Sequence, residues 1–286
     1  MEQANTYTYL NGKIILSEKA SILTNDRGFL YGDGLYETIR IHQGKPFLWE
    51  WHMTRLIAGT EIIGLKLPLT SSKLLEELKK LIQKNNSFNC IARLTITRGP
   101  GERGFGLSGR EIPTVLITLH THRTPQEKAI TLSTTNIRVA KGDVLTTIKS
   151  NNKLNSVMAK YFAKEKNTDD GLILNSDNNI TETSSANIFW IKNNIIKTPP
   201  ISDGVLPGIT RRLVFRLVSK TAQEVKEESL STKKLKQADS VFVTSAATGI
   251  RTVKQIDNNE FREHYLINQL IKTYESELPK YTCPSD

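Results

Sequence analysis

The sequence predicts an α+β protein built from two domains. Its length of 286 residues allows two medium-sized domains, each with a substantial core. Helical and strand-like segments alternate irregularly, whereas a doubly wound sheet requires strict β–α–β alternation. A polar stretch that includes Pro125 and has no hydrophobic periodicity separates the two parts. We therefore expect a smaller N-terminal α/β domain over residues 1–120, a linker over 121–129 and a larger mixed α/β domain over 130–286.

The N-terminal domain is expected to combine strands with two helices. Short β-rich segments bounded by turn residues such as Asn11-Gly12 predict strands. Leu74, Leu78 and Ile82 recur on one face of a helical pattern, which predicts an amphipathic helix. The expected strands cover residues 7–10, 13–16, 36–41, 91–97 and 114–119, and the expected helices cover 50–63 and 72–84.

The C-terminal domain is expected to mix strands and helices in the same irregular way. A helix over residues 155–166 would place Val157, Met158, Tyr161 and Phe162 on its buried side. The other expected helices cover residues 209–218 and 261–278, and the expected strands cover 130–132, 137–139, 172–174, 187–191, 195–197 and 240–244.

The composition excludes several functional classes. No stretch approaches the roughly 20 apolar residues needed to span a bilayer, and residues 1–10 lack the pattern of a secretory signal. Cys90 and Cys283, the only cysteines, give neither a disulfide framework nor metal-ligand spacing. The net charge of +10 comes from scattered basic residues, often beside acids, without a nucleic-acid motif. We therefore expect a cytoplasmic protein that has no metal site and binds neither nucleic acid nor membranes.

One glycine motif has the spacing of a dinucleotide-binding fingerprint but lacks its context. Gly99-Pro100-Gly101-Glu102-Arg103-Gly104 matches GxGxxG and follows a predicted strand. The fingerprint requires a helix that begins at the glycine turn and receives the pyrophosphate at its N-terminus. Further glycines, Pro113 and another predicted strand follow here instead. We therefore do not expect a dinucleotide site.

Lys149 is the candidate nucleophile. It follows a strand-like segment, residues 145–148, and precedes a predicted helix, where a side chain can be held at a domain boundary. A partly desolvated amine in such a place would have a lowered pKa and become a usable nucleophile. Most lysines are solvated, however, and Lys153 is a local competitor for the role.

Two further segments have the chemistry of a cofactor site. Pro207-Gly208-Ile209-Thr210 begins a predicted helix whose amides and dipole favour a phosphate, although an ordinary helix start explains the same residues. Glu182 is the one acid in a run of small hydroxyl residues before a predicted strand. It is either a solvated turn residue or an acid placed to keep a heteroaromatic nitrogen protonated.

These motifs, in this order, resemble those of the class IV aminotransferases. The resemblance covers nearly the whole chain and implies fold type IV, pyridoxal 5'-phosphate (PLP) as cofactor, and homodimers in which the partner subunit helps to build each active site. The family includes D-amino-acid transaminases, branched-chain transaminases and aminodeoxychorismate lyases. The matching motifs are the segment from Asp26-Arg27-Gly28 to Glu37, then Arg55, Ile148-Lys149-Ser150-x-Asn152-x-Leu154, Thr181-Glu182-x-x-x-x-Asn187-Ile188-Phe189 and Pro207-Gly208-Ile209-Thr210-Arg211.

The resemblance also implies roles for the cofactor-binding residues. Lys149 would hold PLP as a Schiff base and then shuttle the α-proton of the substrate. Glu182 would pair with the pyridine nitrogen and keep it protonated, so that the ring can absorb carbanion charge.

On the phosphate side, the resemblance implies that Arg55 binds together with Ile209 and Thr210. A later turn, Thr244-Ser245-Ala246-Ala247-Thr248, matches a further phosphate-binding segment of the family. There Ala246 and Ala247 stand where some relatives have a threonine, so any contact would come from the backbone.

The substrate-side residues match each of the three subgroups in part. Arg103 and Tyr36 resemble residues of D-amino-acid transaminases, in which a loop arginine traps the substrate carboxylate, although Phe105 replaces the histidine that accompanies it. Tyr31 and Arg93 match branched-chain enzymes. Two tyrosines of that group are replaced in this chain, by Leu154 and by Ile91.

The loop also resembles that of the aminodeoxychorismate lyases, through Arg98-Gly99-x-Gly101-x-Arg103-Gly104-Phe105. Arg93 and Arg103 would suit a substrate with two carboxylates, whereas we favour a structural ion pair for Arg98. The lysine motif departs from that group. We therefore expect a transaminase that exchanges an amino group between an amino acid and a 2-oxo acid. The alternative is a 4-amino-4-deoxychorismate lyase that releases pyruvate, and a branched-chain transaminase is less favoured.

Overall fold

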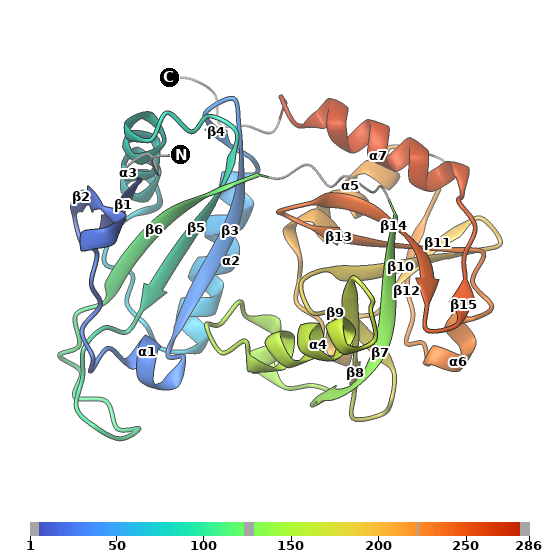
Figure 1. Ribbon diagram of the computed structural model, residues 1–286, viewed down its shortest axis with the longest axis horizontal. Helices are drawn as coiled ribbons and strands as arrows, with labels where there is room; N and C mark the ends of the chain where they lie inside the picture. Colours follow the sequence, from blue (N-terminus) through green and yellow to red (C-terminus); the bar gives the residue numbers. More distant parts are fainter. Residues whose placement is uncertain (1–5, 123–128, 222, 281–286) are drawn as a thin grey trace. The chain divides into compact units, whose positions relative to one another are not determined.

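The structure is a computed structural model that describes residues 6–122, 129–221 and 223–280 (Figure 1). The chain forms two compact units: the first is Met1–Arg123, Ile148–Asn152 and Leu278–Asp286, and the second is Thr124–Thr147 and Lys153–Glu277. Lys149 therefore belongs to the first unit, although the chain before and after its segment belongs to the second. Residues 123–128 of the predicted linker lie outside the described residues. The division into domains 1–120 and 130–286 stays a prediction.

The first unit is built on a six-stranded sheet in which every neighbouring pair is antiparallel. In the strand over residues 90–97, Cys90, Ala92, Leu94 and Ile96 alternate onto the buried face. The strand order is β2-β1-β6-β5-β3-β4, with β1 (Tyr7–Leu10), β2 (Lys13–Leu16), β3 (Gly34–His42), β4 (Lys45–Pro46), β5 (Cys90–Thr97) and β6 (Thr114–Thr121).

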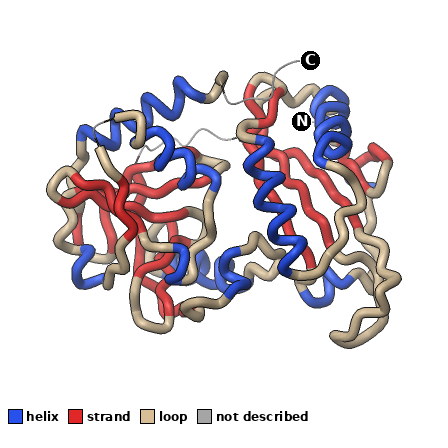
Figure 2. The backbone as a smooth tube through the Cα atoms, turned by 180° about the vertical axis from the view of Figure 1, so that it is seen from behind, coloured by secondary structure: helices blue, strands red, loops and turns tan. Residues whose placement is uncertain are grey.

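Two helices pack on the strands of this sheet, and Figure 2 shows α2 in front of them. Met53 and Leu56 of α2 (Trp49–Ile62) and Leu74 and Leu78 of α3 (Ser71–Lys84) share one apolar core with the sheet. The Thr70 hydroxyl caps α3 by accepting a hydrogen bond from the Lys73 amide at 3.2 Å. The shorter elements of the unit are η1 (Ser17–Lys19) and α1 (Arg27–Tyr31).

The second unit contains a nine-stranded mixed sheet that closes on itself. Strands β10, β13, β14, β7, β8 and β9 pair in that order, and β9 also pairs with β10. The six strands therefore form a ring, which the pair Asn187–Glu182 closes. The strands are β7 (Ala129–Val139), β8 (Asp170–Asn175), β9 (Ile180–Thr183), β10 (Asn187–Lys192), β11 (Ile195–Thr198), β12 (Val225–Glu227), β13 (Ser240–Ser245), β14 (Gly249–Ile256) and β15 (Asn259–Glu260).

Three helices pack against this sheet. α4 (Leu154–Glu165) lies on β7 and β8, α5 (Ile209–Val218) lies on β13, and α7 (Tyr265–Glu277) packs on β14 and on α5. The remaining elements of the unit are η2 (Val144–Thr147), η3 (Ile201–Asp203) and α6 (Thr232–Leu235). Among the residues that the structure describes, no helix is long and apolar enough to cross a bilayer.

The mixed α and β class is confirmed, but some elements differ from those predicted. The predicted strands 130–132 and 137–139 are parts of one strand, β7. The polar residues between them coincide with a register shift in the pairing with β8, between Thr134 and Arg138, after which the pairing resumes. The strand-like segment before Lys149 is mostly the 3-10 helix η2. Its turn is closed by the Thr146 hydroxyl, which donates to the Asp143 carbonyl at 2.6 Å.

The orientation of α4 also differs from the prediction. Val157 and Tyr161 were expected to be buried, but their exposed fractions are 59% and 52%. The buried residues of α4 are Ala159 and Ala163. Gly171 of β8 explains this choice, because a Cβ there would lie 2.2 Å from the Ala159 carbonyl oxygen. The helix approaches the strand through small residues, while Met158 and Phe162 are half-buried and Leu154, Val157 and Tyr161 are exposed.

Candidate active site

Lys149 is fixed to the first unit by its neighbours in the chain. Ile148 is buried in the apolar core of that unit. The Lys149 carbonyl accepts a hydrogen bond from the Tyr36 amide, and the Asn151 amide donates to the Gly34 carbonyl, both at 2.9 Å. These two hydrogen bonds flank the β-bridge between Ser150 and Leu35 of β3. A strand of the first unit therefore sets the backbone position of the candidate nucleophile.

The ring of Tyr36 brings two cationic side chains together. The Lys149 Nζ atom lies 4.6 Å from the ring centroid, and the Arg93 guanidinium carbon lies 3.7 Å from it. Cations at these distances are attracted to an aromatic face. The sequence-predicted residues Lys149, Tyr36 and Arg93 therefore form one cluster in the first unit.

The buried carboxylate of Glu37 binds two side chains of α2. Glu37 Oε1 accepts from Arg55 Nε at 2.9 Å, and Glu37 Oε2 lies 2.6 Å from both Arg55 Nη2 and His52 Nδ1. His52 and Arg55 are three residues apart on α2 and so share a face of the helix. Arg55 is thereby held by Glu37, a residue to which the sequence had assigned no role.

The protonation of this group follows from its charges. Burial favours the neutral form of Glu37, but the charge of Arg55 and the hydrogen bonds from Arg55 and His52 outweigh it and lower the pKa of Glu37 to about 2. Burial lowers the pKa of His52 despite the neighbouring carboxylate, and the charges of Arg55 and Lys149 lower it further. Since an ionised carboxylate only accepts hydrogen bonds, neutral His52 must carry its proton on Nδ1.

In the second unit, three polar residues form a row across adjacent strands. Asn187 of β10 pairs with Glu182 of β9 on one side and with Thr244 of β13 on the other. Directly paired residues project their side chains from the same face of a sheet. The Asn187 amide group donates to the Leu206 carbonyl at 2.9 Å and to Glu182 Oε2 at 3.4 Å, and the Leu206 amide also donates to Glu182 Oε2 at 3.4 Å. This row lies at the ring closure.

The N-terminus of α5 lies beside the same row. Gly208 is the N-cap of α5 and provides no side-chain cap. A Cβ at this position would lie 1.9 Å from Asn187 Oδ1, so any other residue would have to displace Asn187 or the start of α5. The first amides of a helix, here those of Ile209 and Thr210, have no partner in its own hydrogen-bond pattern. Their dipole favours an anion.

The second unit therefore offers the groups that a phosphorylated heteroaromatic cofactor requires. It combines a carboxylate, an N-terminus without a side-chain cap and the Thr244 hydroxyl, which is buried and has no hydrogen-bond partner among the described residues. Ala246 and Ala247 follow in the turn after β13, where the Thr248 amide donates to the Ser245 hydroxyl at 3.2 Å. Alanine side chains cannot hydrogen bond, so only the backbone of these two residues is available.

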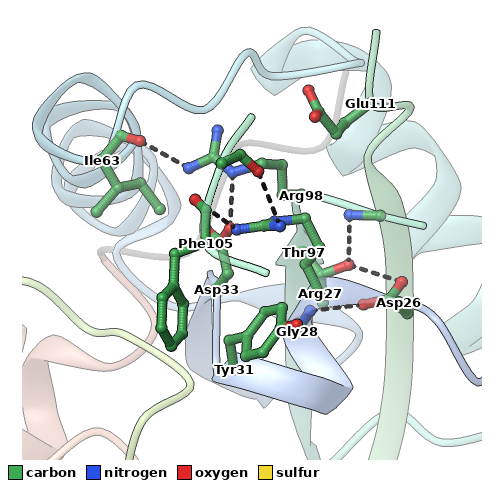
Figure 3. Close-up of polar contacts among 12 residues, drawn as sticks. Asp26, Arg27, Gly28, Tyr31, Asp33, Ile63, Thr97, Arg98, Phe105 and Glu111 are labelled. Atoms are coloured by element: carbon green, nitrogen blue, oxygen red, sulfur yellow. Dashed lines mark hydrogen bonds and ion pairs between the residues drawn. The ribbon is translucent and has the colours of Figure 1, made fainter. Parts of the chain in front are cut away.

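Of the remaining substrate-side candidates, Arg103 belongs to the loop between β5 and β6, and Tyr31 belongs to α1. Arg103 is exposed in this loop, whereas the Tyr31 hydroxyl accepts a hydrogen bond from the Gly104 amide at 2.9 Å. Arg98 forms a structural ion pair, as favoured from the sequence, with Asp33 at 2.8 Å (Figure 3).

The turn that matches a phosphate-binding segment begins at Thr244, but sequence reasoning gave neither Thr244 nor Glu37 a role of its own. The burial of Glu37 could have been predicted, since it lies on the same face of β3 as the buried residues Leu35 and Ile39. The motif located Thr244 in the chain but could not predict its place beside Asn187, which depends on strand pairing between distant segments. No group of three or more potential metal ligands of the His, Cys, Asp and Glu types occurs in the part of the chain that the structure describes.

Comparison with known proteins gives one family. Residues 34–256 match the family described as Amino-transferase class IV. The D-alanine aminotransferase of Staphylococcus epidermidis is 30% identical to this chain over 90% of the chain and 92% of the relative. A Methanocaldococcus jannaschii protein, provisionally named a branched-chain-amino-acid aminotransferase, is 35% identical over 87% of each chain. A Legionella pneumophila structure, provisionally named a 4-amino-4-deoxychorismate lyase, is 32% identical with a TM-score of 0.87, over 91% of this chain and 97% of that chain.

Proposed function

Because the chain belongs to the class IV aminotransferase family, we propose that it binds PLP through Lys149 and moves an amino group between an amino acid and a 2-oxo acid. The observation that carries this proposal is the setting of Lys149. Its backbone is paired with β3, and its amine lies beside Tyr36. The fold therefore fixes this lysine in place, as a covalently acting amine requires.

The other cofactor contacts follow from the chemistry of the site residues. When bound, PLP supplies an electron sink that stabilises negative charge at the substrate α-carbon. Glu182 would keep the ring nitrogen protonated. The amides of Ile209 and Thr210 would bind the phosphate, Arg55 would add a positive charge, and the turn after β13, with Ala246 and Ala247, would add backbone amides.

Lys149 has a second role in this proposal, because its amine would take the α-proton from the substrate and return it. Arg103 would bind the substrate carboxylate, since a guanidinium can donate two parallel hydrogen bonds to it. Tyr31, Tyr36 and Arg93 would line the same side of the site and orient the substrate.

We also propose that the protein is a homodimer. Leu154, Val157 and Tyr161 form an exposed apolar face on α4, with exposed fractions of 67%, 59% and 52%. Exposed apolar patches of this kind mark interaction surfaces. A second copy of the chain would cover this face. The cytoplasmic location predicted from the composition stays a prediction.

The proposal is tested by mixing the PLP-loaded protein with single amino acids in the absence of a 2-oxo acid. D-alanine, D-glutamate, L-leucine and L-glutamate would each be titrated while the visible absorption of the cofactor is recorded. We expect at least one of them to convert the cofactor to its amine form with release of one equivalent of the matching 2-oxo acid. The active enantiomer then defines the substrate class.

A lyase is the second candidate, favoured by the similarity to the Legionella pneumophila structure. It would release pyruvate from 4-amino-4-deoxychorismate, whereas a transaminase would leave the amino group on the cofactor. Bound cofactor that none of the four amino acids converts, together with pyruvate release from 4-amino-4-deoxychorismate, would establish the lyase and contradict the transaminase.

A further inference from the structure

The loop that contains Arg103 has almost no regular structure of its own. It runs from Arg98, after β5, to Pro113, before β6, with a single bridge at Pro100. Loops of this length without helix or strand are uncommon in compact domains and are usually functional. Fixing each loop residue costs about 1–2 kcal/mol of conformational entropy. The contacts that offset this cost therefore determine where Arg103 lies.

One buried side chain, that of Arg27, binds three successive carbonyl groups of the loop. Arg27 Nη1 donates to the carbonyl oxygens of Gly104 at 2.9 Å and Gly106 at 3.3 Å, and Nη2 donates to that of Phe105 at 3.4 Å. The backbone can turn these carbonyls towards one guanidinium because Gly104 has a φ of +106°, which side chains disfavour. Figure 3 shows Arg27 beside Asp33 and Phe105.

Asp33 binds the third guanidinium nitrogen of Arg27. Its Oδ2 atom accepts from Arg27 Nε at 2.9 Å and from Arg98 Nε at 2.8 Å. Burial alone would raise the pKa of Asp33, but the hydrogen bonds from Arg98 and Arg27 lower it, so the carboxylate stays charged. Arg98 shares this carboxylate but donates its other hydrogen bonds to the carbonyls of Ile63 and Gly64, at 2.7 and 2.9 Å. The two arginines therefore share Asp33 but bind different carbonyls: Arg27 binds those of residues 104–106, and Arg98 binds those of residues 63 and 64.

The loop residues before and after Arg103 are both bonded to α1 or to the residues beside it. Before it, the Gly101 amide donates to the Asn25 carbonyl at 3.1 Å. After it, the Gly104 amide donates to the Tyr31 hydroxyl at 2.9 Å, and the Phe105 and Tyr31 ring centroids are 5.4 Å apart. The backbone of Arg103 thus lies between two attached points, while its side chain is exposed.

We propose that Arg27 is a positioning residue that fixes the loop 98–113 and thereby sets the location of Arg103 and the affinity for the substrate carboxylate. The statement on affinity rests on the proposed function, whereas the statement on the loop does not. Arginine is required because its planar guanidinium binds the carboxylate along one edge and several carbonyls along another. A lysine ammonium has no such fixed geometry.

The experiment compares Arg27→Met and Arg27→Lys with Arg98→Met in the PLP-loaded enzyme. Arg98→Met is the matched control, because it removes the other arginine of Asp33 without touching the loop carbonyls. Brief exposure to trypsin, followed by mass analysis of the peptides, measures cleavage after Arg103, since proteases cut exposed segments that leave their folded position. Steady-state kinetics with the best amino acid measures KM and kcat separately.

We expect both Arg27 variants to be cleaved after Arg103 about tenfold faster and to raise KM about tenfold, as the loss of charge-assisted hydrogen bonds implies. We expect kcat to change much less, and Arg98→Met to leave the cleavage rate and KM near those of the parent. Arg27→Lys retains the charge beside Asp33, so it keeps the test valid if Arg27→Met fails to fold.

Unchanged cleavage in Arg27→Lys would overturn the proposal, and so would equal acceleration in Arg98→Met. Faster cleavage with an unchanged KM would overturn the link between the loop and the carboxylate. Arg103→Met tests the proposed function separately. If it leaves KM unchanged, Arg103 does not bind the substrate, although the cleavage result for Arg27 still stands.

Discussion

Glu37 shows how a single buried charge ties two elements together. The alternation of β3 places it on the same face as buried Leu35 and Ile39, where an unpaired carboxylate would cost several kcal/mol. Arg55 and His52 of α2 supply the partners. An acidic residue on the buried face of a strand therefore indicates that a cationic side chain lies nearby. The sequence does not say which element carries that cation.

We expect Glu37→Gln to destabilise the protein by about 3 kcal/mol, because it leaves the Arg55 guanidinium without its buried counter-charge. The free energy of unfolding in urea at neutral pH measures this loss. Glu61→Gln, an exposed substitution on the same helix, is the control and should have little effect. Equal stability of the two variants would show that the carboxylate contributes nothing.

The same variant should change the response to acid. The pKa of Glu37 is about 2 in the folded protein and 4.5 is its ordinary value, so the unfolded chain takes up the proton first as the pH falls. The stability from this group is therefore complete above about pH 4.5 and lost as the pH falls towards 2. We expect the difference in unfolding free energy between parent and Glu37→Gln to shrink over this range. A constant difference would contradict the assigned pKa.

Lys149 and Lys153 provide a matched pair for the covalent chemistry. We expect Lys149→Ala to abolish amino-group transfer, since the nucleophilic amine is gone. For the same reason, treatment with borohydride, which reduces the Schiff base, should no longer attach PLP to the protein permanently. Lys153→Ala should retain both. Mass spectrometry of the reduced protein locates the modified residue. Attachment at Lys153 in the parent would show that the wrong lysine had been chosen.

At the scale of elements, the approach of α5 to the sheet depends on the absence of one side chain. A Cβ at Gly208 would lie 1.9 Å from Asn187 Oδ1, so Gly208→Ala must displace Asn187 or the start of α5. We expect the Kd for PLP to rise about tenfold, because the amides of the helix N-terminus would no longer meet the phosphate correctly. Fluorescence titration of the cofactor-free protein measures this.

The control for this prediction is Gly106→Ala. A Cβ at Gly106 would meet nothing within 4 Å, so the Kd for PLP should stay that of the parent. A normal Kd in Gly208→Ala would mean that the phosphate is not bound at α5.

Elements with strong local signals could be predicted, and those that depend on distant partners could not. The helix over residues 209–218 matches α5 because its apolar periodicity and the preceding Pro207-Gly208 are local. The strand β14 was missed, although its residues 249–256 pair with two other strands. The outward face of α4 was also wrongly predicted, because a preference for burying large side chains cannot anticipate the close contact at Gly171.

At the scale of the whole molecule, residue types could be predicted more reliably than their grouping. The motif order indicated Lys149 and Glu182, but not that Lys149 belongs to the first unit and Glu182 to the second. Such assignments depend on register between segments far apart in sequence. The ring that Asn187 and Glu182 close is one example, because its closing pair joins the two ends of a six-strand path.

The exposed face of α4 gives a prediction for the assembly. We expect Val157→Asp and Tyr161→Asp to convert a dimer into monomers, because a charge would be buried without a partner in the interface. Lys164→Asp, an exposed position on the same helix, should leave the dimer intact. Light scattering coupled to gel filtration measures the mass. Dimers that persist in both apolar variants would place the interface elsewhere.

The course of the chain between the units limits how relatives of this protein can be recombined. The chain changes unit after residues 123, 147, 152 and 277. A chimera spliced once near residue 123 would therefore take the sheet of the first unit from one parent and its lysine segment, Ile148–Asn152, from the other. Ile148 would then have to fill a foreign core, and the lysine beside it would inherit any misfit. Exchange of a complete first unit requires two additional junctions around that short segment, as well as one near residue 277.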